Sequence, residues 1–151
     1  MAYFVEVPSE TAQVEATAKP PKKIARARLS VAARPARIFY AALSSALAAG
    51  VLVQVFFAGM GAFGADWSYH LTFVHLLEPL PPLMVLVAFI GRLPWGLRLL
   101  PLALTFLIGV QYAFANAAVP AAALHPVNGF LILLTSFFIV RRAWVAARRR
   151  G

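Results

Sequence analysis

The stretch IFYAALSSALAAGVLVQVFFAGMGAF, residues 38–63, runs without a single charged side chain. An α-helix rises about 1.5 Å per residue, so about 20 apolar residues are enough to cross the roughly 30 Å hydrocarbon core of a bilayer. Inside a bilayer no water pairs with the peptide groups, and the backbone must satisfy its own hydrogen bonds. The stretch is therefore predicted to be a membrane-spanning helix.

Three more apolar segments of similar length follow, at about residues 69–90, 99–118 and 120–140. The 151-residue chain is 62% hydrophobic and 13% charged, whereas soluble domains are about half apolar and about a quarter charged. Short links favour antiparallel neighbours. The sequence thus predicts an all-α fold, a membrane-spanning up-down-up-down four-helix bundle over residues 37–145.

Both ends of the chain differ from this apolar part in composition. Residues 1–36 combine glutamates, prolines and a basic cluster without apolar periodicity, which is typical of a disordered tail. This tail is too long and too polar before its first apolar run to be a cleaved signal peptide, so we expect it to be retained. Residues 146–151 form a short basic C-terminus.

The positive charges predict the orientation in the membrane. Every Lys and Arg lies in the N-terminal tail, in the link that carries Arg92 and Arg98, or from Arg141 onwards, while the other two links have none. Basic segments stay in the cytoplasm. We therefore expect a multi-pass protein of the cell (inner) membrane with both termini cytoplasmic. The net charge of +9 then indicates contact with anionic lipid headgroups and not with nucleic acid.

Several kinds of chemistry have no basis in this sequence. The chain has no cysteine, which excludes disulfides and thiolate metal sites. No Ser-His-Asp set, phosphate-binding loop or metal motif of established spacing is visible. No catalytic residue is predicted, and a non-enzymatic role is favoured.

Four polar residues from the four predicted helices are expected to form one buried layer: Gln54, Glu78, Gln111 and Asn128. Counted from the outer boundary, they lie roughly 10 to 13 Å deep, in the outer half of the membrane. Intramembrane polar groups usually face the bundle interior. The prolines that follow Glu78 free carbonyls in the second helix, and the amides of this layer are at the right height to donate to them.

The histidines suggest a cofactor site. His75 and Glu78 are one turn apart on the same face and are expected to pair. His75 and His125 fall at similar depths, about 9 and 6 Å, on two parallel helices that lie diagonally across the bundle. Such a pair can hold a haem iron from both sides. His70, at the interface near Asp66, is predicted to be either solvated or a third haem contact.

Two alternatives remain open beside a small one-haem membrane cytochrome or quinone-linked redox partner. In one, the polar layer only joins helices, and the protein is a non-catalytic subunit or scaffold that binds membrane protein partners through small residues such as Ala42, Ala46 and Gly50. In the other, His75, Glu78 and His125 bind zinc or non-haem iron.

The segments VQVFFAGMGAF (53–63), WSYHLTFVH (67–75) and ALHPVNGFLILL (123–134) resemble a bacterial family of small four-helix membrane proteins of unknown function. The resemblance covers about residues 36–145 and implies the fold. A looser architectural likeness to haem-b bundles, of the cytochrome b561 type and the haem A synthase halves, implies a b-type haem between helices two and four. Because the chain lacks their second histidine pair, a two-haem electron path is not expected.

Overall fold

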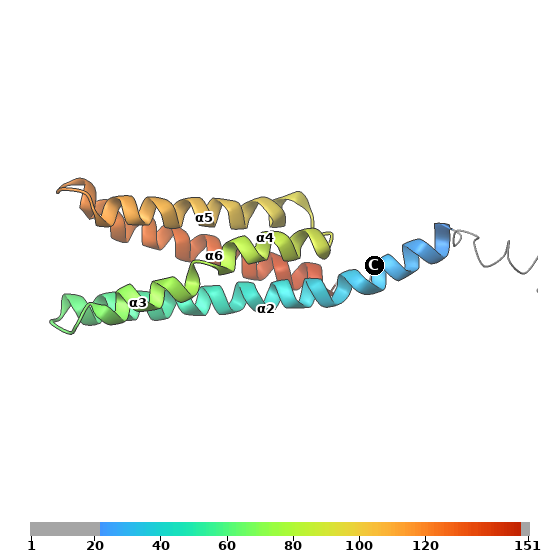
Figure 1. The fold of residues 1–151 in the computed structure, drawn as a ribbon, viewed down its shortest axis with the longest axis horizontal. Helices are drawn as coiled ribbons and strands as arrows, with labels where there is room; N and C mark the ends of the chain where they lie inside the picture. Colours follow the sequence, from blue (N-terminus) through green and yellow to red (C-terminus); the bar gives the residue numbers. More distant parts are fainter. Residues whose placement is uncertain (1–21, 149–151) are drawn as a thin grey trace, which may run out of the picture.

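In the computed structural model, the backbone is described for residues 22–148 and the side chains for residues 33–148. This part of the chain is helical and contains no strand, which confirms the all-α prediction. The helices form four rods, the second made of the two shorter helices α3 and α4, and Figure 1 shows the rods lying side by side. The elements in chain order are α2 (Lys22–Ala62), α3 (Ser68–Leu77), α4 (Leu80–Ile90), α5 (Trp95–Ala115), the 3₁₀ turn η1 (Ala121–Ala123) and α6 (Leu124–Arg148).

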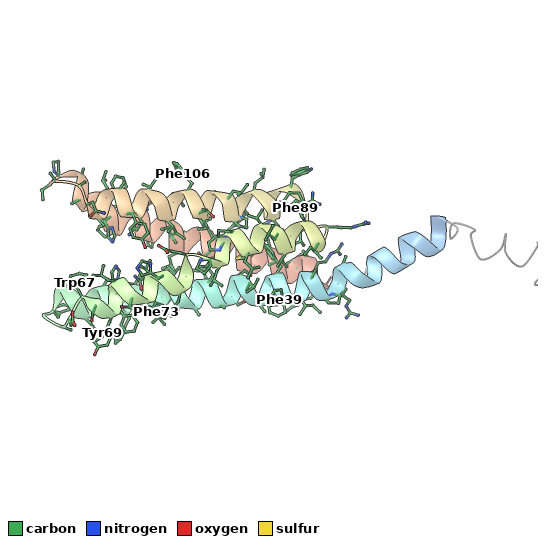
Figure 2. All side chains as sticks on the ribbon, viewed as in Figure 1. Phe39, Trp67, Tyr69, Phe73, Phe89 and Phe106 are labelled. Atoms are coloured by element: carbon green, nitrogen blue, oxygen red, sulfur yellow. The ribbon has the colours of Figure 1, made fainter. Side chains whose placement is uncertain are left out.

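Within the described residues, four segments are long and apolar enough to cross a membrane: Ala33–Ala62, Ser68–Ile90, Trp95–Ala115 and Ala121–Arg148. Large apolar side chains cover the outside of the bundle, as Figure 2 shows for Phe39 and Phe106. The exposed fraction of Phe106 is 71%. Water-soluble monomers rarely expose apolar surface on this scale, so the prediction of a four-helix membrane bundle is confirmed.

The helices extend further than the predicted spans. The tail expected over residues 1–36 is already helical from Lys22 onwards, so this prediction needs correction for residues 22–36. Residues 1–21 and 149–151 lie outside the described residues. At the other end, α6 continues past residue 140 to Arg148. Hydrophobicity marks the part of a helix that contacts lipid, and a polar end can continue the same helix into water.

The second rod is interrupted between Leu77 and Leu80, at the first of the prolines Pro79, Pro81 and Pro82. A proline inside a helix removes a backbone donor and clashes with the preceding turn. The two pieces have different neighbours: α3 packs on α2 alone, whereas α4 packs on both α2 and α5. Figure 1 shows α3 beside α2 and α4 closer to α5.

The half of the bundle that contains α4 is tightly packed, and we call it the closed half. It comprises α4 with residues 33–51, 95–106 and 132–148. Tyr40, Met84, Leu104 and Ile139 are completely buried there. The Tyr40 hydroxyl donates a hydrogen bond of 2.7 Å to the carbonyl oxygen of Leu97. In a helix this oxygen would accept from the N–H four residues later, but that residue is Pro101, which has no N–H.

The other half, called the open half, comprises α3 with residues 52–62, 107–115 and 124–131. Among its described residues only Gly61, Leu77 and Asn128 are buried. Figure 1 shows α2 and α3 along one side of this half and α5 with the start of α6 along the other. Between them lies a cavity of about 640 Å³ with a largely apolar lining.

Candidate functional site

Gln54 and His70 join the ends of the first hairpin, α2 and α3. The Gln54 side-chain amide donates a hydrogen bond of 2.8 Å to the carbonyl oxygen of His70. In return, His70 Nδ1 lies 3.2 Å from the carbonyl oxygen of Gln54. The edge of the Trp67 ring packs against the His70 ring, with 5.8 Å between centroids. This reciprocal pair fixes the imidazole of His70 against α2.

Gln111 and His125 repeat the same arrangement in the second hairpin, α5 and α6. The Gln111 amide donates to the carbonyl oxygen of His125 at 3.0 Å, and His125 Nδ1 lies 3.1 Å from the carbonyl oxygen of Gln111. Asn128 extends this half by donating to the Gln111 side-chain oxygen at 2.5 Å and to the Leu107 carbonyl oxygen at 2.8 Å. Each hairpin therefore contains its own reciprocal pair of a glutamine and a histidine.

These contacts determine which imidazole nitrogen is available for a ligand. A carbonyl oxygen only accepts, so Nδ1 must be the donor in both His70 and His125. In the neutral ring, Nε2 then carries the free lone pair. A histidine that binds a metal usually donates its other ring N–H to a carbonyl or carboxylate in this way.

His70 and His125 face the same cavity from opposite hairpins. Their ring centroids are 6.3 Å apart, with 59° between the ring planes. An imidazole nitrogen binds a metal at about 2 Å, and the ring centre lies about 1 Å behind it, so two imidazoles on opposite sides of one metal ion have centres about 6 Å apart. The observed separation suits two axial ligands of one metal ion.

The predicted pairing of His75 with His125 is not the arrangement in the structure. His75 does not line the cavity, and 66% of its side chain is exposed. His70 takes its place, although it lies closer to the end of the helix. The depth count compared heights only, and the turn between His70 and His75 rotates them onto different faces of α3.

His75 instead forms the expected pair with Glu78, with 3.2 Å between Nδ1 and a carboxylate oxygen. The other carboxylate oxygen of Glu78 accepts a hydrogen bond from the Tyr112 hydroxyl of α5. A zinc or non-haem iron site of His75, Glu78 and His125 is not present. Within residues 33–148, no three His, Asp or Glu side chains come together as metal ligands.

The amides of the polar layer do not serve the carbonyls freed by the prolines. Gln54, Gln111 and Asn128 donate to His70, His125 and Leu107 instead. The side-chain oxygen of Gln54 is buried without a hydrogen-bond partner in the described structure. All four polar residues line the same cavity, but they do not form one connected layer: Gln54 bonds within the first hairpin, Gln111 and Asn128 within the second, and Glu78 bonds to Tyr112.

A repeat in the sequence could have revealed the two equivalent half-sites. Residues 53–58 read VQVFFA and residues 110–115 read VQYAFA, and a histidine follows each glutamine after a short turn. The spacing is 16 residues from Gln54 to His70 and 14 from Gln111 to His125. Aligned on their glutamines, the two hairpins single out His70, and not His75, as the equivalent of His125.

These features define a multi-pass α-helical membrane protein made of two similar hairpins around an apolar cavity with two histidines. Residues 54–118, less than half of the chain, match a family of unknown function (DUF6220). The matched segment includes Gln54, His70, Glu78 and Gln111, and it ends before His125. No curated protein and no solved structure matches the chain.

Proposed function

We propose that the protein is a small membrane cytochrome that binds one b-type haem between His70 and His125. The observation that carries this proposal is the pair of histidines from opposite hairpins, each with Nδ1 bound to a carbonyl and the ring centres 6.3 Å apart. The flat macrocycle would lie in the cavity between the two hairpins, whose volume of about 640 Å³ is in the range of cofactor pockets.

The donor set also indicates the type of haem and its chemistry. Without cysteine the chain has no thiol for a covalent thioether bond, so the haem would be held by its axial ligands and by packing. Two histidine ligands leave no open position on the iron, which favours electron transfer over oxygen activation. The small residues Ala58, Ala115 and Gly129 line the cavity and allow close approach of a flat ligand.

An absorption spectrum tests this function. Protein expressed with added haem and purified in mild detergent should show a Soret band and, after reduction, a sharp α band. His70→Ala and His125→Ala should each lose at least nine tenths of the pigment. His75→Ala is the matched control and should keep it. Colourless wild-type protein, or pigment that depends on His75 and not on His70, would contradict the proposal.

The orientation proposed from the charges, with both termini cytoplasmic in the cell membrane, is supported by the placement of the arginines. Arg37 and Arg98 donate hydrogen bonds to the carbonyl oxygens of Gly91 and Leu93, at the end of the closed half. Because the chain has no cysteine, single cysteines can test this. A membrane-impermeant maleimide should label Ala65→Cys in intact cells and Arg92→Cys only after permeabilisation. The opposite pattern would invert the orientation.

A scaffold role is the second candidate, and one observation favours it. Ala42 and Ala46 are exposed on the outside of α2, one turn apart, while Gly50 is buried against Leu77. Small residues at this spacing allow another membrane helix to approach closely. Ala42→Leu with Ala46→Leu should abolish co-purification of a partner if this role holds. A protein that stays monomeric with or without these substitutions would exclude it.

A further inference from the structure

The cavity is not fully enclosed, and residues of both α3 and α5 line it; we place its opening towards the membrane between these two helices. α3 and α5 do not pack against each other, whereas α4, which follows α3 after the turn at Pro79, packs against α5. In the described part of the chain, one hydrogen bond joins the end of α3 to α5, from Tyr112 of α5 to Glu78, the residue directly after α3. Both residues line the cavity. This bridge therefore stands in the opening.

The bridge continues outwards as a chain of groups that bind protons. Glu78 accepts from Tyr112 on one carboxylate oxygen and contacts His75 Nδ1 at 3.2 Å on the other. The exposed fraction rises from 34% for the Glu78 side chain to 66% for that of His75. Among residues 33–148, His75 is the only ion-pair partner of Glu78. A proton taken up at the cavity can thus pass from the carboxylate to the exposed imidazole.

We infer that this opening binds a membrane-soluble hydroquinone, with a ring hydroxyl donating to Glu78 in place of Tyr112. The site requires an occupant that enters from lipid, is mostly apolar and flat, and carries a hydroxyl donor. A phospholipid tail has no such donor at that depth, and a water-soluble reductant could not reach a largely apolar cavity. The inference rests on the proposed haem for its electron transfer, but not for binding.

The reaction balances with the haem as the oxidant. With haem bound, one hydroquinone oxidised in two one-electron steps on two protein molecules would reduce two ferric haems and release one quinone and two protons. Each hydroxyl O–H bond that breaks would pass its proton to the Glu78 carboxylate, which His75 contacts, one proton and one electron for each protein molecule. Glu78 touches the substrate in this scheme, whereas Tyr112 holds the carboxylate in place until the hydroxyl arrives.

Two substitutions separate proton uptake from structure. Glu78→Gln keeps an oxygen that accepts from Tyr112 but cannot take a proton, so hydroquinone-driven haem reduction should slow at least tenfold. Tyr69→Phe removes an exposed phenol of α3 that does not line the cavity, and it should react like wild type. Haem content, spectrum and reduction by dithionite should be unchanged in both variants.

The experiment mixes ferric protein in lipid nanodiscs with a benzohydroquinone that carries a ten-carbon tail, without oxygen. We expect two haems reduced for each hydroquinone. If dithionite reduces the wild-type haem and the hydroquinone does not, the inference is overturned while the haem proposal stands. Equal rates for Glu78→Gln and wild type would also overturn it.

A binding measurement on haem-free protein keeps the two proposals apart. Isothermal titration of the same hydroquinone into nanodiscs should saturate at one site per chain. Affinity should fall about tenfold in Glu78→Ala and stay unchanged in Tyr69→Phe. If the protein binds no haem but shows this pattern, the haem proposal fails and the hydroquinone site stands. Absence of saturable binding, or equal loss in both variants, would overturn the site.

Discussion

The closed half and the open half are the two ends of the same four-rod bundle, but they are held together differently. In the closed half, side chains such as Tyr40, Met84 and Leu104 pack completely out of contact with solvent. In the open half, few described side chains are buried, and hydrogen bonds connect Gln54 to His70 and Gln111 to His125. In the closed half, apolar packing holds the two hairpins against each other. In the open half, the glutamine–histidine hydrogen bonds hold together the two helices of each hairpin.

The difference explains why a cavity can persist. Lipid tails are as apolar as leucine, so apolar side chains alone do not drive membrane helices together, and close packing or hydrogen bonds must do so. In the open half the two amide–histidine pairs each bond inside their own hairpin, and between the hairpins the described residues form one hydrogen bond beside the cavity, from Tyr112 to Glu78. The closed half holds the two hairpins at a fixed spacing and leaves the far ends free to accept a ligand.

The largest expected effect on stability comes from a cavity in the closed half. Leu104→Ala removes a completely buried side chain and should lower the free energy of unfolding by about 2 kcal/mol, mostly through lost packing. Phe106→Ala, on the exposed face of the same helix at 71% exposure, should change it by less than about 0.5 kcal/mol. Circular dichroism in dodecyl sulfate titrations measures both. Equal losses would mean that the buried core of the closed half is no more tightly packed than its outer surface.

The next effect comes from the carbonyl that Pro101 leaves without its helical donor. Tyr40→Phe removes the hydroxyl that serves the Leu97 carbonyl and should cost about 1 to 2 kcal/mol, because a buried acceptor loses its partner. Pro101→Ala restores an N–H at that position, so Tyr40→Phe in this background should cost much less. The double-mutant cycle in the same titration measures the difference. A cost that stays the same would disprove this role of Tyr40.

A smaller effect should separate the two polar pairs of the open half. Gln111 takes part in three hydrogen bonds: two with His125, and one in which its side-chain oxygen accepts from Asn128. The side-chain oxygen of Gln54 has no such partner. At about 0.6 kcal/mol per contact in a membrane, Gln111→Leu should cost about 1 kcal/mol and Gln54→Leu about half of that. Unfolding titrations give the order, and the reverse order would contradict it.

The sequence predicted the helices better than the site, for physical reasons. Membrane spans depend on local hydrophobicity, so the four rods followed from composition alone. Which histidine faces His125 depends on the face of α3 from which its side chain projects. A depth count gives the height of a residue but not its face, so it favoured His75 over His70. The two VQ segments do carry this information, because each glutamine bonds to the first histidine of the next helix. The unequal packing of the halves depends on where α3 and α4 part at Pro79, which composition does not reveal.

The smallest effect lies at the water-exposed turn before α3. Asp66 accepts hydrogen bonds from the backbone N–H and the hydroxyl of Ser68, at 2.9 and 2.7 Å. These two bonds lower the pKa of its carboxyl below the ordinary value of 3.8. Since the folded pKa is the lower one, the contribution of Asp66 to stability is present above the unfolded value and is lost as the pH falls through the folded value.

Amide exchange in the first turn of α3 should therefore accelerate slightly below about pH 4, beyond its intrinsic pH dependence. Asp66→Ala should show the faster exchange at every pH and no further change on acidification. The Leu104 region of the closed half should not respond to either change, because its packing involves no group that titrates in this range. If acid-induced exchange spreads from the turn into the closed half, the two halves unfold as one unit. They would then differ in packing density but not in their free energy of unfolding.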